Sequence, residues 1–487
     1  MKKLKQVEYR DFSKGTIRTA NPSITPKNSH ILALNYDSDY EIGSLVSRLG
    51  NDILGVQMRS GAVTLGLHQH VETSGTALFG VYSDGTNNDI YFASTGAKSL
   101  EDDTKNLKTR FCTYLGATVR VNGTDVCKSY TAAGGWISTG GAFNVGNMPI
   151  GKIVIEWKDR IYVGAKPGFP GIVFYSSIAD PSAKTVSWSD TTSGTGSGQI
   201  EIEQEDNGGD LTAFAKVPGY LLIFKERTMK RWDGNTTFPE DLVRQGVMSQ
   251  ECVCSGKEMA FFVNKKGVWA TNGGYPVRIS KPVQDFIDAI PGANWANIAI
   301  TSDDEHVFVS IGDVTVGKDD FENVVLKFNI GTESWDVYSY YNEFRIFGTY
   351  IDSNSIPSVV AGDIDGQILK LGTGNTDYAS TPKPITWSFE SNDLEFGSRG
   401  KLKQISKMYT YTENVSTGQI MYRKDSHDPK DWQNIGKVEE PVTESKDLGI
   451  SGHFFNIKIT GVSDTGRTKL LGYEFPEDSI TILDNVK

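Results

Sequence analysis

The sequence of 487 residues contains few cysteines and few histidines, and both shortages limit the sites it can build. Its four cysteines are too few for a disulfide scaffold in a chain of this length. Cys252 and Cys254 would share one face of a strand, but no CxxC pair and no histidine at zinc spacing accompanies them. We therefore expect free thiols.

Long apolar stretches are also missing. The longest runs, such as residues 220–224, are far too short to span a bilayer. The N-terminus, MKKLKQVEYRDF, is basic but lacks the apolar core of a signal peptide. These features predict synthesis in the cytosol and no insertion into a membrane.

Catalytic signatures are absent as well. The chain has no GxSxG, HExxH or Walker-type loop, and none of the repeated Ser-x-Asp-x-Gly-x-x-Trp turns of sialidase-like propellers. His68 and His70 share a strand face without a third ligand, so we interpret them as polar surface residues. Asp363 and Asp365 start like a calcium loop but lack its later ligands, which favours a hairpin turn. We expect no catalytic residue, metal or cofactor, and hence no enzyme.

Glycine and aromatic residues, by contrast, are plentiful. The 51 glycines, 20 tyrosines and 23 phenylalanines are typical of short strands joined by tight turns. The formal net charge of −11 argues against a protein that grips duplex DNA, because phosphate binding needs clustered Lys and Arg.

Residues 252–290 show the repeating unit most clearly. An apolar strand over 258–264 meets a turn at Gly267, where a positive φ is needed, and strands follow over 268–271 and 277–279. A short helix should begin at Pro282 and present one apolar face; that face is formed by Val283, Phe286, Ile287 and Ile290. One such meander cannot bury both its faces, so it implies neighbours of the same kind.

Similar hairpins recur every 40–60 residues or so, about the period of propeller blades. The hairpins lie at residues 78–93, 111–126, 160–176, 219–234, 306–338 and 358–371. We therefore predict an all-β protein with a β-propeller at residues 61–375; five to seven blades fit, and we expect six. Trp269, on a strand between Gly267 and Gly273, should be buried between blades.

The two ends of the chain differ from this pattern. Residues 1–60 predict an extended N-terminal arm with a hairpin at its end, ordered by neighbouring chains or by the propeller surface. A turn-rich linker over 373–384 is followed by alternating strands, which indicate an antiparallel β-sandwich at residues 376–487.

Two motifs carry a family resemblance. The first is Phe12, Gly15, Pro26, Asn35-Tyr36, Gly43, Leu45, Arg48 and Gly50, and the second is Gly267, Trp269, Gly273 to Pro276, Arg278, Ile279 and Ser280 before a helix. In this order they resemble the tail hub or tail nozzle proteins of short-tailed bacteriophages (podoviruses), which have a propeller body. Lys14 departs from the pattern, which more often has a second glycine there.

The resemblance implies a structural virion protein. Such a viral tail protein would be a homo-oligomer, a ring of six copies below the portal and adaptor and near the tail fibre proteins, and DNA would pass through it transiently during ejection. Glu201, Glu203 and Glu205 share one strand face, which is either the solvated face of an edge strand or an acidic lining of that channel. An acidic lining would let DNA slide. The alternative function is a carbohydrate-binding or carbohydrate-cleaving β-propeller that stacks aromatic side chains on sugars.

Overall fold

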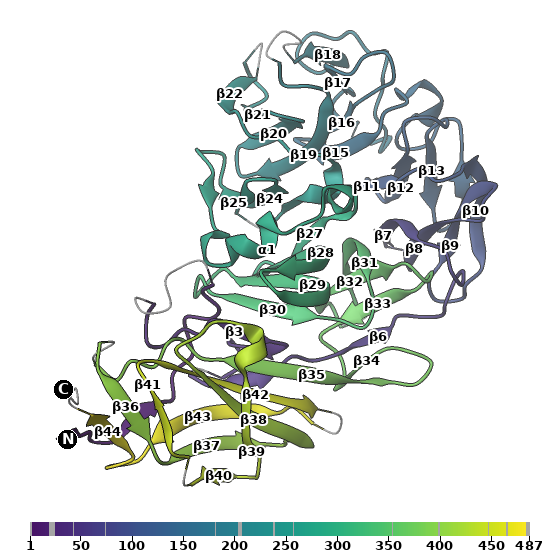
Figure 1. Ribbon diagram of the computed structural model, residues 1–487. Coiled ribbons are helices and arrows are strands. Elements are labelled where there is room, and N and C mark those ends of the chain that lie inside the picture. The colour runs from purple at the N-terminus through teal and green to yellow at the C-terminus, as the bar shows by residue number, and fades with distance from the viewer. Residues whose placement is uncertain are drawn as a thin grey trace.

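Figure 1 shows the computed structural model, in which a ring of sheets adjoins a second group of sheets that contains both chain ends. The structure describes residues 2–18, 25–41, 43–73, 75–180, 182–202, 207–236, 239–256, 258–352, 354–397, 400–446, 448–463 and 466–483. The protein is all-β and its ring is a β-propeller. Among the described residues, none of the helices has the length and apolar character that a membrane crossing needs.

Within the described residues the ring consists of seven units of four antiparallel strands, the blades. The first blade consists of β7 (Thr64–Glu72), β8 (Gly75–Ser83), β9 (Asn87–Phe92) and β10 (Lys98–Thr104). The second consists of β11 (Arg110–Tyr114), β12 (Ala117–Val121), β13 (Lys128–Thr131) and β14 (Gly135–Ile137). The third consists of β15 (Ile153–Trp157), β16 (Arg160–Gly164), β17 (Ile172–Tyr175) and β18 (Gly198–Glu201). The fourth consists of β19 (Leu211–Val217), β20 (Tyr220–Lys225), β21 (Met229–Trp232) and β22 (Glu240–Val243). The fifth consists of β23 (Val253–Ser255), β24 (Ala260–Asn264), β25 (Gly267–Thr271) and β26 (Val277–Arg278). The sixth consists of β27 (Ala299–Ser302), β28 (His306–Val316), β29 (Asp319–Asn329) and β30 (Trp335–Ser339). The seventh is β31 (Phe344–Ile351), β32 (Pro357–Asp363), β33 (Ile368–Leu371) and β6 (Asn51–Ile53).

The ring closes through its first strands and through β6. The first strand of each blade contacts that of the next, and β31 of the last blade contacts β7 of the first. The outermost strand of the seventh blade is β6, which pairs Asn51 with Leu371 and Ile53 with Leu369. The expected six blades are therefore corrected to seven. The last blade takes its fourth strand from a distant part of the chain, so it does not form a complete unit in the sequence.

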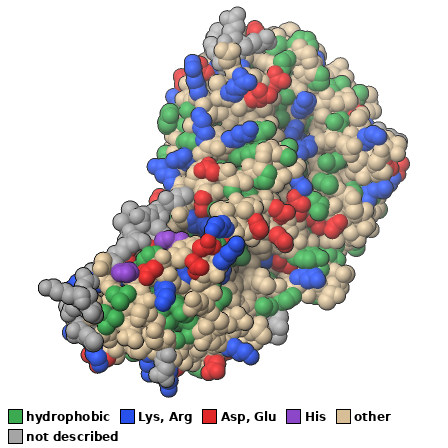
Figure 2. All heavy atoms as spheres, in the orientation of Figure 1, with side chains coloured by type: hydrophobic (Ala, Val, Ile, Leu, Met, Phe, Trp, Pro, Cys, Tyr) green, Lys and Arg blue, Asp and Glu red, His purple; other side chains and the backbone are tan. Residues whose placement is uncertain are grey.

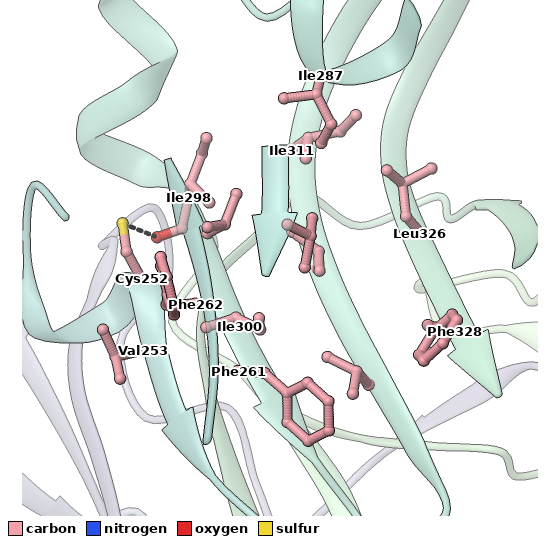
Figure 3. Close-up of a cluster of buried hydrophobic side chains, with 14 of the residues drawn as sticks. Cys252, Val253, Phe261, Phe262, Ile287, Ile298, Ile300, Ile311, Leu326 and Phe328 are labelled. Carbon is pink, nitrogen blue, oxygen red and sulfur yellow. Dashed lines mark hydrogen bonds between the residues drawn. The ribbon is translucent and has the colours of Figure 1, made fainter. Parts of the chain in front are cut away.

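The largest apolar core in the described residues extends over the fourth, fifth and sixth blades. Figure 3 shows Phe261 and Phe262 of β24 beside Ile300 of β27, with Leu326 of β29 further across the core, and all four are buried. The predicted helix is present as a 3₁₀ turn, Lys281–Val283, followed by α1 (Gln284–Asp288). Its predicted apolar face is confirmed, because all four of its residues are buried against this core.

The second group of sheets combines both ends of the chain. Its N-terminal strands are β1 (Lys2–Lys3), β2 (Val7–Tyr9), β3 (Leu32–Leu34), β4 (Tyr36–Asp37) and β5 (Leu45–Ser47). The C-terminal strands are β34 (Thr376–Asp377), β35 (Lys383–Glu390), β36 (Leu402–Ile405), β37 (Met408–Glu413), β38 (Thr417–Lys424), β39 (Gln433–Lys437), β40 (Val442–Ser445), β41 (Ile450–Gly452), β42 (Phe455–Ser463), β43 (Lys469–Phe475) and β44 (Ile480–Leu483). They form antiparallel sheets around one core that includes Phe12, Tyr36, Leu45, Trp387 and Phe455. That these sheets make a sandwich stays a prediction.

The N-terminal segment runs extended, as expected, but its order does not come only from the propeller surface or from other chains. β1 pairs with β44 and β2 with β43, and the hairpin of β4 and β5 adds to the same sheet as β43. Strand β3 lies between β30 and β35, parallel to the first and antiparallel to the second. One continuous sheet therefore runs from the sixth blade into the C-terminal strands (Figure 1).

Candidate functional site: the joint and the central channel

Arg48 is the centre of the contact between the propeller and the C-terminal sheets, a contact we call the joint. Its side chain is 2% exposed and pairs with both carboxylate oxygens of Asp377, at 2.8 and 2.7 Å. The Nε atom donates to Asn35 Oδ1 (2.8 Å), and the remaining hydrogens go to the carbonyl oxygens of Leu49 (3.0 Å) and Ser339 (2.6 Å). All five guanidinium donors are thereby used, as a buried arginine requires.

The surroundings of Arg48 explain its position. Asn35 also accepts from the backbone N–H of Ser339 (2.7 Å) and donates to the carbonyl of Thr386 (2.7 Å). A Cβ on Gly50 would lie 1.9 Å from the carbonyl oxygen of Thr376, so only glycine fits there. The joint therefore ties the N-terminal segment, the end of the sixth blade and the predicted linker to one another.

The residues singled out near the N-terminus thus have structural roles in the joint or beside it. Leu45 is fully buried in the C-terminal core, and Gly43 has a φ of 89° in the turn before β5. Sequence reasoning missed the partner Asp377, which lies in the turn-rich stretch interpreted as a linker. No local signal marks it, because its role depends on a residue more than 300 positions earlier in the chain.

Three carboxylates meet beside the joint, and we call Asp37, Asp39 and Asp336 the carboxylate cluster. Each offers an oxygen within 4.8 Å of the others. Lys327 Nζ lies 3.1 Å from Asp37 Oδ1 and 2.8 Å from Asp39 Oδ2, and His306 Nε2 is 3.1 Å from the same Asp39 oxygen. Lys327 therefore contacts two of the three carboxylates directly and offsets part of their charge.

Burial and charge set the protonation of this cluster. Burial raises the pKa of Asp336 to about 7, against the pull of Lys327 and with help from the other two carboxylates. Burial alone would lower the pKa of His306, but hydrogen bonds to Asp303 and Asp39 raise it to about 9. Asp336 therefore titrates near neutral pH, and the neighbouring His306 titrates above it, at the boundary between the sixth blade and the N-terminal segment.

The central channel of the propeller is bridged by an ion pair. A cavity of about 190 Å³ lies among the first strands of the blades. There Arg110 of the second blade makes two hydrogen bonds to Glu251, just before the fifth blade, at 2.8 and 3.0 Å, and Lys108 adds a contact of 3.3 Å. Burial alone would raise the pKa of Glu251, but Arg110 and Lys108 outweigh it and hold the pKa well below its usual range.

His68 and His70 are not the surface residues that we expected. His70 is fully buried and bonds to Thr118 (2.9 Å), while His68 stacks on Phe111 and bonds to Thr113 (2.6 Å). Both rings face the second blade, a neighbour that the periodicity of one strand cannot reveal. Burial, with a smaller effect of His70, lowers the pKa of His68 to about 3, so the ring is neutral.

The remaining turn and blade motifs were predicted with mixed success. The hairpin at Asp363 is confirmed, since its Oδ1 accepts from the backbone N–H of Asp365 and of Gln367, both at 2.9 Å. Gly267 has the positive φ that was predicted, 145°. Trp269 is only partly buried; it stacks on Phe262 of its own blade instead of filling a gap between blades.

Arg278 and Ile279 complete the edge of the fifth blade. Arg278 lies opposite Trp269 in the pairing of β25 with β26 and donates to the carbonyl of Lys266 (3.4 Å). The backbone N–H of Ile279 donates to the carbonyl of Val268 (2.9 Å). These residues close the blade's outer edge, and the carbonyl of Ile279 also accepts from Nε1 of Trp335 (2.9 Å) at the start of β30 in the sixth blade.

Only one of the three predicted lining carboxylates can be placed. Glu201 is exposed on β18, the outermost strand of the third blade, opposite Ile172. Glu203 and Glu205 lie outside the described residues. Glu201 is therefore far from the propeller's own axis, and a role in lining a channel between copies stays a prediction.

Known proteins show only weak similarity to this chain. No protein-family model matches the sequence, and no curated protein is significantly similar to it. Similar solved structures include BBS1N in complex with ARL6DN (12% identity over 68% of this chain and 97% of that chain, TM-score 0.42) and YCF48 bound to D1 peptide (10%, 68% and 100%, 0.39). Another is Sqt1 of Saccharomyces cerevisiae (9% identity over 67% of this chain and 100% of that chain, TM-score 0.41). At these identities and TM-scores the similarity carries no argument about this protein.

Proposed function

We propose that the protein is a structural virion component, a tail hub or nozzle of a short-tailed phage, in which six copies form a ring below a portal and adaptor. The proposal starts from the first motif of the resemblance. Of its residues, Arg48 and Gly50 build the joint, and Leu45 belongs to the core beside it. A motif used in this way is structural and not catalytic.

The observation that carries the proposal is the satisfied hydrogen bonding of Arg48. The donors of the buried Arg48 guanidinium are all used, and together they bind three different parts of the chain. A continuous sheet also crosses the boundary between the propeller and the C-terminal sheets. A hinge between the two parts would break these bonds, each of which would leave a buried group unpaired at a cost of about 1–3 kcal/mol. A ring subunit needs such fixed geometry, because its two sides must meet neighbours at a constant angle.

The bridged channel bears on the path of DNA. Arg110 and Glu251 cross the propeller axis, and the cavity there is only about 190 Å³. DNA would therefore pass through the opening between copies and not through the propeller itself. Glu201, with Glu203 and Glu205, is our candidate for the lining of that opening, where carboxylates would repel phosphate and prevent adhesion.

Mass in solution and images of single particles test the proposal. We expect a species of several times 53.5 kDa by light scattering, ring-shaped in negative stain, that co-purifies with virions. Arg48→Ala should weaken the ring by loosening the joint, whereas Lys184→Ala, at an exposed loop position, should leave it unchanged. A chain that stays monomeric at every concentration and is missing from virions would contradict the proposal.

A second candidate function, carbohydrate binding, is favoured by one groove. About 670 Å³ of space lies over β35, β38 and β42, and its lining includes the polar residues Thr386, Ser388, Thr417, Gln419 and Thr460. Such hydroxyl-rich lining suits a sugar. A glycan array would decide between the two functions, with Gln419→Ala as the variant that should lose any glycan bound there.

A further inference from the structure

A groove of about 530 Å³ lies where three turns of the fourth and fifth blades meet. One turn joins β20 to β21, one joins β24 to β25, and the third is the segment 244–248 that leads from β22 towards β23. We call this the basic groove. Figure 2 shows Lys and Arg side chains gathered over the flank of the propeller where these strands lie.

Asn264 joins two of the three turns of the basic groove, and Gly246 packs against the third. Its Nδ2 donates to the carbonyl of Gly246 (3.1 Å), and its Oδ1 accepts from the backbone N–H of Lys266 (2.9 Å) and from Trp269 Nε1 (3.1 Å). The segment at Gly246 lies directly on the neighbouring turn, because a Cβ there would be 2.0 Å from the carbonyl oxygen of Lys225. The backbone under the groove is thus fixed before anything binds.

The side chains over this backbone are mainly cationic. The groove is lined by Arg227, Arg244, Lys265 and Lys266, all exposed, against the single carboxylate of Glu226. In the part of the chain that the structure describes, the side chains of Arg244, Lys265 and Lys266 form no ion pair. The whole chain has 60 acidic and 49 basic residues, so a concentration of unpaired cations runs against its average charge. Such a patch raises the local concentration of anions.

We propose that the basic groove binds a compact molecule that carries two or more phosphate groups. A guanidinium can pair with two oxygens of one phosphate, while an ammonium adds a point charge from a flexible stem. Arg227 and Arg244 lie on the turns of the fourth blade and Lys265 and Lys266 on the facing turn of the fifth, so two phosphates can be held between them. The volume is that of an ordinary small-molecule site. This site does not depend on the proposed ring.

Isothermal titration of the full-length protein with tripolyphosphate tests this site. We expect one site per chain, with an affinity that falls as salt rises because the groove's charges are screened. The double variant Arg244→Glu/Lys265→Glu should weaken binding about 100-fold, since each charge-assisted hydrogen bond is worth about tenfold. Its thermal unfolding should match that of the wild type, because both positions are exposed.

A matched double variant separates the groove from general charge. Lys184→Glu/Lys401→Glu makes the same change in net charge at exposed positions that do not line the groove, and it should bind tripolyphosphate like the wild type. The proposal is overturned if the wild type does not bind at millimolar concentration. It is also overturned if the groove variant binds unchanged, or if the control loses as much affinity as the groove variant.

Discussion

Arg110 and Glu251 meet across the central channel of the propeller, joined by two hydrogen bonds of 2.8 and 3.0 Å. Arg110 belongs to the second blade and Glu251 lies just before the fifth, and these blades are not neighbours in the ring. The side chain of Glu251 is 5% exposed and that of Arg110 15%, so the pair is largely withdrawn from solvent. It therefore braces the ring internally, in addition to the contacts between adjacent blades.

Removing one partner of this pair should destabilise the propeller. Arg110→Ala leaves the carboxylate of Glu251 buried with Lys108 and Ser249 as its remaining partners, and we expect a loss of about 3 kcal/mol, the lower end of the range for broken buried pairs. Glu251→Ala should cost a similar amount. In denaturant unfolding the double variant should lose less than the sum of the two, which is the signature of a direct interaction. Strict additivity would show that the bridge contributes nothing.

The carboxylate cluster and His306 should make the stability of the joint depend on pH, and the directions of the two pKa shifts determine whether stability rises or falls. The pKa of Asp336 rises from 3.8 to about 7 on folding, so its contribution to the free energy of unfolding is complete below pH 3.8 and is lost as pH rises towards 7. The pKa of His306 rises from 6.5 to about 9, so its contribution is lost between those values. Both groups therefore weaken the folded state as the solution becomes more alkaline.

Two substitutions separate these contributions. Asp336→Asn should flatten the fall in melting temperature between about pH 5 and 7, and His306→Gln should flatten it between about pH 7 and 8.5. The readout is the difference in melting temperature between each variant and the wild type across that range. A constant difference at all pH values would mean that the pKa of the group is the same in the folded and unfolded states.

Arg48 should not be replaceable by lysine. Arg48→Lys keeps the charge but cannot bond to both oxygens of Asp377 and to three further acceptors at once. We expect a loss of about 3 kcal/mol, close to that of Arg48→Ala, together with faster proteolytic cleavage between the propeller and the C-terminal sheets. If lysine were tolerated, charge alone would hold the joint.

Strands formed by neighbouring residues were largely predictable from the sequence. The meander over β24, β25 and β26 and the apolar face of α1 follow from alternation, turn glycines and a proline at a helix start. These signals are local, because each depends on residues a few positions apart. The same is true of the hairpin at Asp363.

Contacts between distant segments could not be predicted in this way. The closing strand β6 pairs with β33, and Arg48 pairs with Asp377, across more than 300 residues in each case. The burial of His70 depends on Thr118 of the next blade, which periodicity within β7 does not reveal. The blade count, the role of the linker and the environment of both histidines therefore required the structure.

The N-terminal strands should be needed for the stability of the C-terminal sheets. Tyr9 stacks on Tyr473 with ring centroids 4.9 Å apart, Val7 lies opposite Phe475, and Arg10 bonds to Glu474 at 2.9 Å. Deleting residues 1–10 would remove β1 and β2 and leave one edge of β43 unpaired and partly apolar. We expect a lower melting temperature and a tendency to aggregate, in contrast to an arm that folds only on a partner.

Single substitutions test the same contact without removing backbone. Tyr9→Ala should cost about 1–2 kcal/mol, because it removes a partly buried ring and its stacking contact with Tyr473. Lys5→Ala, at an exposed position between β1 and β2, should change stability by less than about 0.5 kcal/mol. If both the deletion and Tyr9→Ala leave the unfolding curve unchanged, the first two strands contribute nothing to the isolated chain. Their order would then have to come from a neighbouring molecule.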